Sequence, residues 1–218
     1  MGQFIKMLKT IHLQYRERGL LCTLAMNLSH LTGVIRGLIY KLIYFRSIQY
    51  APYSMQSNST IEVFNKRSKI RLGKFVFIRK NVSIRMDFDG ELTLGDNVFI
   101  NDNCTINCVN KIHIGNHTKI APNVCINDHD HNYKKTDEGH LIKGEVVIGS
   151  GVWIGSNVVI LRDTFIGDHA VIAAGSVVKG TVPAHTLFLN KRENIFKEII
   201  ESKSNIVNMK PVTTRSQA

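Results

Sequence analysis

The chain has 218 residues and a formal net charge of +11, with 44% hydrophobic and 21% charged residues. This balance is typical of a folded globular chain and excludes a disordered or fully membrane-embedded one. No Cys-x-x-Cys pair and no signal-peptide pattern occur, so we expect a reducing cytosol. The basic residues lack interleaved aromatic residues on a recognisable platform, which gives no support to nucleic-acid binding.

Residues 1–50 carry seven Lys and Arg and a single acidic residue, Glu17. Apolar residues recur there at helical spacing, as in Phe4, Leu8, Ile11 and Tyr15. We therefore predict a basic, amphipathic helical segment over residues 1–55. Its apolar runs are too interrupted for a spanning helix, which needs ~20 mostly apolar residues. Peripheral membrane contact and simple packing on the rest of the fold both remain open.

An aliphatic residue then returns every six positions through much of the chain. The clearest positions are Leu94, Ile100, Ile106, Ile114, Ile120, Ile126, Ile148, Ile154, Ile160, Ile166, Ile172 and Val178. This spacing fits neither a helix nor one long alternating strand, but it fits short strands joined by tight corners. Gly and Asn at the corners supply left-handed backbone. We predict a mainly β fold, a parallel β-helix over residues 56–183.

The end of the chain has a different pattern. Ile195, Phe196, Ile199 and Ile200 recur at helical spacing among charged residues. The sequence therefore predicts a short C-terminal helix within residues 184–206. Residues 207–218 have little apolar content and are predicted to form a mobile tail.

The repeat is interrupted between residues 127 and 145, beginning with "NDHDHNYKK". Loops that leave a rigid scaffold often carry function. His129 and His131 lie on the same side of an extended chain, and Asp128 or Asp130 could orient either ring. A metal site, a catalytic base and an ordinary solvated loop are all compatible with this composition.

The hexapeptide array resembles the left-handed parallel β-helix of the hexapeptide-repeat acyltransferases. The stretch "VFINDNCTINCVNKIHIGNHTKIAPNVCINDHDH" is similar to the maltose, galactoside and nodulation-factor acetyltransferase branch, and the resemblance covers roughly residues 70–183. It implies a homotrimer with active sites between subunits, acetyl-CoA as co-substrate and no metal. Matched position by position, the catalytic histidine falls on His131 and the acceptor-contacting asparagine on Asn101. His129 is retained as a second catalytic candidate.

The resemblance also implies a donor site on the coils after the catalytic loop. The pantetheine arm of CoA would run beside small residues, here Gly155, Ser156, Ala174 and Gly175. Small side chains allow a ligand to approach the backbone closely. Lys179 and Lys197 are candidate partners for the CoA phosphates.

Together these observations predict an acetyl-CoA-dependent O-acetyltransferase that modifies a sugar hydroxyl of a capsule, O-antigen or exopolysaccharide. A neutral imidazole is suited to remove the hydroxyl proton near neutral pH, so no covalent acyl-enzyme is required. We expect a cytoplasmic enzyme, peripheral on the inner face of the cytoplasmic membrane. The alternatives are an N-acyltransferase of an amino sugar, a serine acetyltransferase-like enzyme, a non-catalytic scaffold, and a zinc protein like the γ-class carbonic anhydrases that uses His117, His129 and His131.

Overall fold

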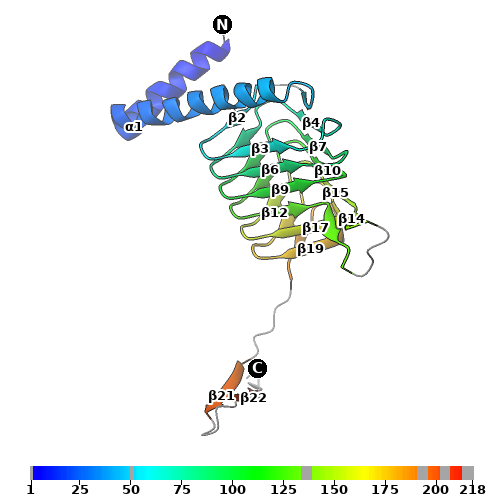
Figure 1. Cartoon of the computed structure of the whole chain (residues 1–218). Coiled ribbons are helices and arrows are strands. Elements are labelled where there is room, and N and C mark those ends of the chain that lie inside the picture. The colour runs from blue at the N-terminus through cyan, green and yellow to red at the C-terminus, as the bar shows by residue number, and fades with distance from the viewer. Residues whose placement is uncertain (1, 50–51, 134–138, 191–195, 202–206, 213–218) are drawn as a thin grey trace.

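The computed structural model describes residues 2–49, 52–133, 139–190, 196–201 and 207–212. Short parallel strands stack coil upon coil into a solenoid, and the long helix α1 (Gly2–Ile43) crosses its first coil (Figure 1). The predicted β-solenoid and the N-terminal helix are confirmed.

The solenoid has three faces, each built from strands that pair in parallel with the coils before and after. The first face contains β1 (Ile48–Gln49), β4 (Lys69–Leu72), β7 (Glu91–Leu94), β10 (Lys111–Ile114), β15 (Glu145–Ile148) and the second half of β17 (Val159–Ile166). The second contains β2 (Ser54–Met55), β5 (Phe77–Ile78), β8 (Phe99–Ile100), β11 (Lys119–Ile120), β16 (Trp153–Ile154), β18 (Val171–Ile172) and β20 (Leu187–Phe188). The third contains β3 (Thr60–Val63), β6 (Ser83–Met86), β9 (Thr105–Cys108), β12 (Cys125–Asn127) and the first halves of β17 and β19 (Val177–Val182).

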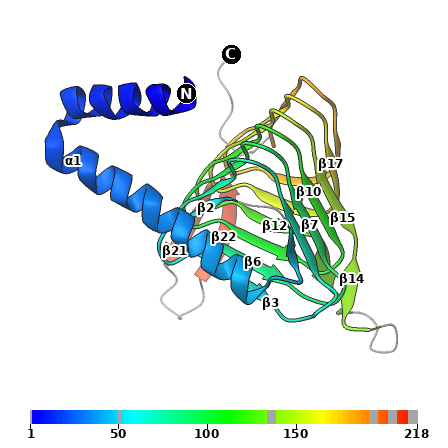
Figure 2. The same ribbon diagram turned by 90° about the horizontal axis from the view of Figure 1, so that it is seen from above.

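The core is the stack of six-residue repeats seen in the sequence. Ile100, Ile120, Ile154 and Ile172 are direct register partners on successive coils, and all are buried. Burial of one such side chain stabilises the fold by about 1.5–3 kcal/mol, so the column alone supplies a large apolar contribution. The view along the solenoid shows the coils superposed around this narrow interior (Figure 2).

The corners between the faces use left-handed backbone, as predicted. The residues with positive φ at these turns are mostly asparagines and histidines: Asn58, Asn81, Asn97, Asn103, Asn123, Asn157, His117, His169 and His185. Asn and His tolerate this conformation better than β-branched residues do. The three corner histidines therefore serve the left-handed backbone conformation of these turns.

The solenoid is longer than the predicted 56–183. β1 and β2 precede residue 56, and β20 follows residue 183. The first coil lacks a clear hexapeptide because α1 covers it: Tyr40 and Tyr44 pack against the core there, and Tyr53 is 2% exposed. In the first coil, larger residues can therefore occupy positions that hold small residues in the regular repeats.

The predicted C-terminal helix is wrong. β21 (Phe196–Glu201) and β22 (Val207–Val212) form an antiparallel pair instead. The sequence "FKEIIE" satisfies helical and alternating periodicities alike, and its adjacent β-branched residues Ile199 and Ile200 favour a strand. The tail prediction is also wrong over Val207–Val212, while residues 213–218 lie outside the described residues.

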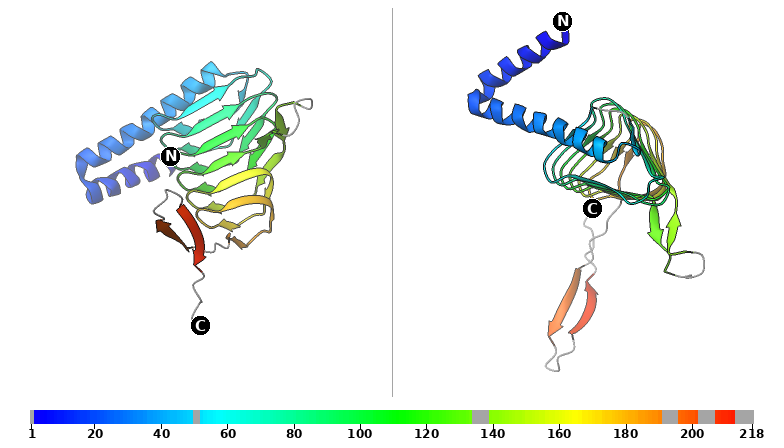
Figure 3. Two further views of the ribbon diagram at one scale, coloured as in Figure 1. Left: turned by 60° about the horizontal axis from the view of Figure 1, so that its bottom comes forward. Right: turned by 45° about the horizontal axis from the view of Figure 1, so that its top comes forward.

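Helix α1 has two arms separated at Gly19, whose φ of 76° and ψ of 171° interrupt the helix. The bend turns residues 2–18 away from the line of residues 20–43 (Figures 2 and 3). Within the described part of the chain, no helix has the length and apolar content needed to cross a bilayer.

Candidate functional site at the histidine hairpin

The interruption of the repeat is an antiparallel hairpin that projects from the solenoid. β13 (His129–His131) pairs with β14 (Leu141–Lys143), with His129 opposite Lys143 and His131 opposite Leu141. The backbone N–H of Gly144 donates to the Asp128 carbonyl at 2.7 Å, and the Asn110 side-chain amide donates to the Gly144 carbonyl at 2.8 Å. These contacts close the base of the hairpin, so its orientation is set by the rigid coils beneath it.

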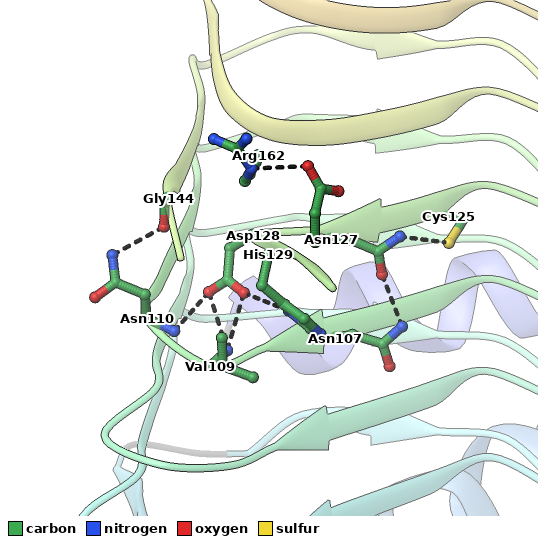
Figure 4. Close-up of polar contacts among 10 residues, drawn as sticks. Asn107, Val109, Asn110, Cys125, Asn127, Asp128, His129, Gly144 and Arg162 are labelled. Carbon is green, nitrogen blue, oxygen red and sulfur yellow. Dashed lines mark hydrogen bonds and ion pairs between the residues drawn. The ribbon is translucent and has the colours of Figure 1, made fainter. Parts of the chain in front are cut away.

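Asp128 is the anchor of the site, because its carboxylate is fully buried. It accepts hydrogen bonds from the backbone N–H groups of Val109 at 3.0 Å and Asn110 at 2.7 Å (Figure 4). Its Oδ1 also lies 3.0 Å from Nδ1 of His129. A buried carboxylate with three partners is well satisfied. Because a carboxylate oxygen accepts, we assign Nδ1–H of His129 as the donor to Asp128, which makes Nε2 the basic nitrogen of the neutral ring.

Asp130, the second candidate orienting group, has a different partner. Its Oδ2 accepts from Nε of Arg162 at 2.7 Å, and Arg162 also contacts Asp163. Asp130 therefore ties the hairpin to β17 on the next coil. Among the described residues, it is His129 of the two histidines that has a carboxylate partner.

His129 and His131 line one open hollow of about 330 Å³. The other lining residues are Phe64, Arg85, Asp87, Phe88, Asn107, Cys108, Val109, His140 and Leu141. Sequence reasoning missed most of these, including His140 and Asn107. The Asn107 side-chain amide donates to Asn127 at 2.7 Å. Asn107 follows Asn101 by six residues, so the repeat itself offered a signal for its position on the next face.

Cys108 is a potential nucleophile in this hollow, but its surroundings disfavour the thiolate. Burial raises the pKa of the Cys108 thiol well above its usual range, and the neighbouring Asp128 charge raises this pKa further. Cys104 is 1% exposed, and burial raises its pKa to about 11. Both cysteines are therefore held as neutral thiols near neutral pH.

The predicted donor-site residues gather at another corner of the solenoid, between the second and third faces. Gly155 donates its N–H to the Ile172 carbonyl at 2.9 Å, and Gly175 donates to the Ser156 carbonyl at 2.8 Å. A Cβ on Gly155 would lie 2.6 Å from the Ala174 nitrogen. Gly155, Ser156, Ala174 and Gly175 thus form two stacked turns, hereafter the donor corner.

Asn101 lies on the same edge as the donor corner and does not line the hollow. Its N–H donates to the Ile120 carbonyl, and the Ala121 N–H donates to the Ile154 carbonyl, which continues the ladder to Gly155. The Asn101 side chain accepts from the Asp102 N–H at 2.9 Å. Within one chain, Asn101 and the two hairpin histidines therefore occupy different edges.

The two predicted phosphate-binding lysines also lie apart from the donor corner. Lys179 is exposed on β19. It lies between the part of β19 that pairs with Val159–Ile160 and the part that pairs with Thr164–Ile166. Lys179 is therefore at the same edge of the solenoid as Arg162. Lys197 lies in β21, outside the solenoid strands. Neither is part of the donor corner.

The described residues contain no group of three or more His, Cys, Asp or Glu side chains arranged to hold a metal ion. His117 lies at a corner with φ of 58°, where β10 turns into β11, rather than beside the hairpin. The three histidines of the zinc alternative are therefore not assembled within one chain.

Comparisons with known proteins agree with this architecture. Residues 145–180 match the family described as bacterial transferase hexapeptide (six repeats). A putative acetyltransferase of Staphylococcus aureus strain Mu50 is 34% identical over 141 residues, which cover 62% of this chain and 71% of that protein. The putative lipopolysaccharide biosynthesis O-acetyl transferase WbbJ of Escherichia coli K12 is 35% identical over 130 residues, covering 54% of this chain and 66% of WbbJ.

Two further proteins extend the comparison. The galactoside O-acetyltransferase of E. coli K12 is 28% identical over 174 residues, which cover 77% of this chain and 84% of that enzyme. Among solved structures, AntD, an N-acyltransferase from Bacillus cereus in complex with dTDP and coenzyme A, superposes with a TM-score of 0.57. It is 14% identical, and the match covers 82% of this chain and 89% of AntD, so it shows a shared fold.

The fold, the repeat and these relatives define the class as hexapeptide-repeat acyltransferases. The chain belongs to this family.

Proposed function

We propose that this protein is an acetyl-CoA-dependent O-acetyltransferase that acts on a sugar hydroxyl of a cell-surface polysaccharide. The observation that carries the proposal is the His129 ring held by the buried Asp128 carboxylate, in a hollow that also contains His131. Such a base and orienting group are what proton removal from a neutral hydroxyl requires. The names of WbbJ and the galactoside enzyme support an oxygen acceptor on a glycan.

In the proposed reaction, Nε2 of His129 removes the proton of the acceptor hydroxyl while the hydroxyl oxygen attacks the thioester carbonyl carbon. Asp128 stabilises the imidazolium that forms. The tetrahedral intermediate then collapses, the carbon–sulfur bond breaks, and the CoA thiolate takes the proton from His129. The products are the O-acetyl sugar and CoA, without an acyl-enzyme. We assign the base to His129 because Asp128 orients its ring, and we assign His131 to acceptor contact. The family resemblance implies His131 as the base instead.

The donor corner supplies the other half of the proposal. Ser156 and Gly175 are partly exposed and Ala174 is exposed, so a pantetheine arm can approach the backbone beside these small residues. AntD, which shares the fold, was crystallised with coenzyme A. The donor corner and Asn101 share one edge of the solenoid, whereas the hairpin lies on another. We propose that a homotrimer completes the site, because a neighbouring subunit can bring its edge to the hairpin.

The test measures acetyl transfer from acetyl-CoA to a panel of glycans, with sugars that carry free amino groups included. We expect His129→Ala to lower the rate by about 10²–10⁴-fold, the usual contribution of a general base. His131→Ala should mainly raise the KM for the acceptor. His185→Asn is the matched control, because it changes a corner histidine while keeping a residue that tolerates positive φ.

Three results would change the proposal. Full loss with His131→Ala and near-normal transfer with His129→Ala would place the base at His131. Acetylation of amino sugars alone would identify an N-acyltransferase. Transfer that survives both histidine substitutions would remove the hollow from the reaction.

A further inference from the structure

Helix α1 packs on the solenoid through small residues and Tyr40 instead of its leucines. A Cβ on Gly33 would lie 2.5 Å from Oγ of Ser54, and one on Gly37 would lie 2.5 Å from the Tyr53 carbonyl oxygen. Both glycines are buried, so the helix approaches the first coil closely along this face. His30 adds a ring contact with Phe77 at 5.5 Å on the same side of the helix.

The opposite face is a continuous apolar stripe that lacks a partner within the described chain. Residues spaced three and four apart share one face of a helix. This stripe consists of Leu24, Leu28, Leu31, Ile35, Leu38 and Leu42, which are 45% to 75% exposed. In ordinary surface helices the apolar face points toward the core, so here the orientation is reversed. An exposed stripe of this length marks a binding surface.

The charges around the leucine stripe are basic. Residues 20–46 contain no Asp or Glu, whereas Arg36 and Lys41 lie on opposite flanks of the stripe at 100° per residue. Arg46 stacks its guanidinium over the exposed Phe45 ring at 5.4 Å at the end of the helix. Long basic side chains flanking an apolar face are typical of a helix that lies in the plane of a lipid interface.

We infer that the leucine stripe of α1 docks the enzyme onto an anionic lipid surface, with the helix lying flat. An anionic surface complements the seven basic residues among residues 1–50, which are opposed only by Glu17. A second copy of the same face would bring like charges together, which opposes self-association. The inference is independent of the proposed chemistry.

The shape of the molecule suits this docking. α1 crosses one end of the solenoid, and the coils that carry the hairpin follow below it (Figures 1 and 3). With the stripe on lipid, the solenoid would project from the surface. The lining of the hollow begins at Phe64, just after β3 of the first coil, and reaches His131 on β13. An acceptor glycan held by a lipid would then be within reach of the histidines.

The experiment is sedimentation of the full chain with vesicles of phosphatidylcholine, with and without phosphatidylglycerol. We expect pelleting that depends on phosphatidylglycerol and weakens with salt. The stripe variant, L28S with I35S and L42S, should lower the lipid partition coefficient at least about tenfold, because three apolar side chains no longer enter the interface. The matched control, F75S with L187S and L189S, changes three comparably exposed residues elsewhere and should pellet like the parent chain.

A charge variant, R36Q with K41Q and R46Q, should lose the preference for phosphatidylglycerol while keeping residual binding. Circular dichroism and acetyl-CoA binding verify that each variant is folded. Parent protein that stays in solution with both vesicles, or a stripe variant that pellets like the parent, overturns the inference. A stripe variant that changes oligomeric mass by light scattering also overturns it, because the occupant would then be a second copy.

Discussion

Cys108 lines the same hollow as His129, and the protonation state of its buried thiol separates two reaction types. Because burial and Asp128 raise its pKa, we expect no thiolate near neutral pH and no acyl-cysteine intermediate. Iodoacetamide should modify the exposed Cys22 and leave Cys104 and Cys108 intact, as read by peptide mass spectrometry. Labelling of Cys108 at the rate of Cys22 would instead favour a covalent mechanism.

His113 provides a pH-dependent contribution to stability. It is half-buried in β10, and burial lowers its pKa, with a smaller effect from Lys111. In the unfolded chain its pKa is ~6.5, so as pH falls below that value the unfolded state binds a proton more readily than the folded state. This contribution to the free energy of unfolding is therefore complete above pH ~6.5, and it is lost as the pH falls toward the lower pKa of the folded state. Urea titrations of His113→Gln should show a smaller loss of stability on acidification than the parent chain; an identical pH dependence would contradict this assignment.

At this scale, the sequence predicted the chemistry-bearing residues but not their pairing. The two aspartates beside the histidines were equivalent in the sequence, because either carboxylate could reach either ring. The choice depends on two backbone N–H groups, of Val109 and Asn110, that hold Asp128 inside, and on Arg162 of the following coil. Such long-range partners leave no local pattern.

The stacked glycines set how closely successive coils approach. A Cβ on Gly115 would lie 2.5 Å from the carbonyl carbon of Gly149 and 2.6 Å from the nitrogen of Ser150, and these backbone atoms cannot rotate away. We expect Gly115→Ala to lower the free energy of unfolding by about 1–3 kcal/mol, measured by urea denaturation.

Gly180→Asn is the control for this substitution. Gly180 has a φ of 86° with open space around its Cβ position, and Asn tolerates left-handed backbone. Its effect should stay within about 0.5 kcal/mol. Equal effects of the two substitutions would show that coil spacing is not limited by the glycine column.

Elements with strict six-residue repeats were predicted well, because each repeat reports the same local geometry. The first coil and the C-terminal hairpin were not predicted. The first coil is completed by α1. The glycines of α1 lie against Tyr53 and Ser54, and this contact forms only when the chain is folded. In β21 the adjacent isoleucines satisfy two periodicities, and pairing with β22 decides between them.

At the scale of the whole molecule, the hairpin and the donor corner lie on separate edges of one solenoid, while α1 caps its end. The sequence predicted the solenoid and named candidate residues in both places. It could not place them on separate edges, because that depends on how the strands and corners follow one another around three faces. The proposed trimer and the proposed lipid contact use different surfaces of the same chain.

The account depends most on a donor site at the donor corner. The decisive measurement is calorimetric titration of acetyl-CoA into the full chain, with and without a chelator, for the parent protein, Ser156→Phe and Ser150→Phe. Ser156 lies in the donor corner, and Ser150 occupies the same repeat position at another corner. We predict saturable binding by the parent and by Ser150→Phe, unchanged by the chelator, and loss of binding with Ser156→Phe. No binding by the parent, together with stoichiometric zinc in the protein, would contradict the acyltransferase mechanism and favour a zinc enzyme.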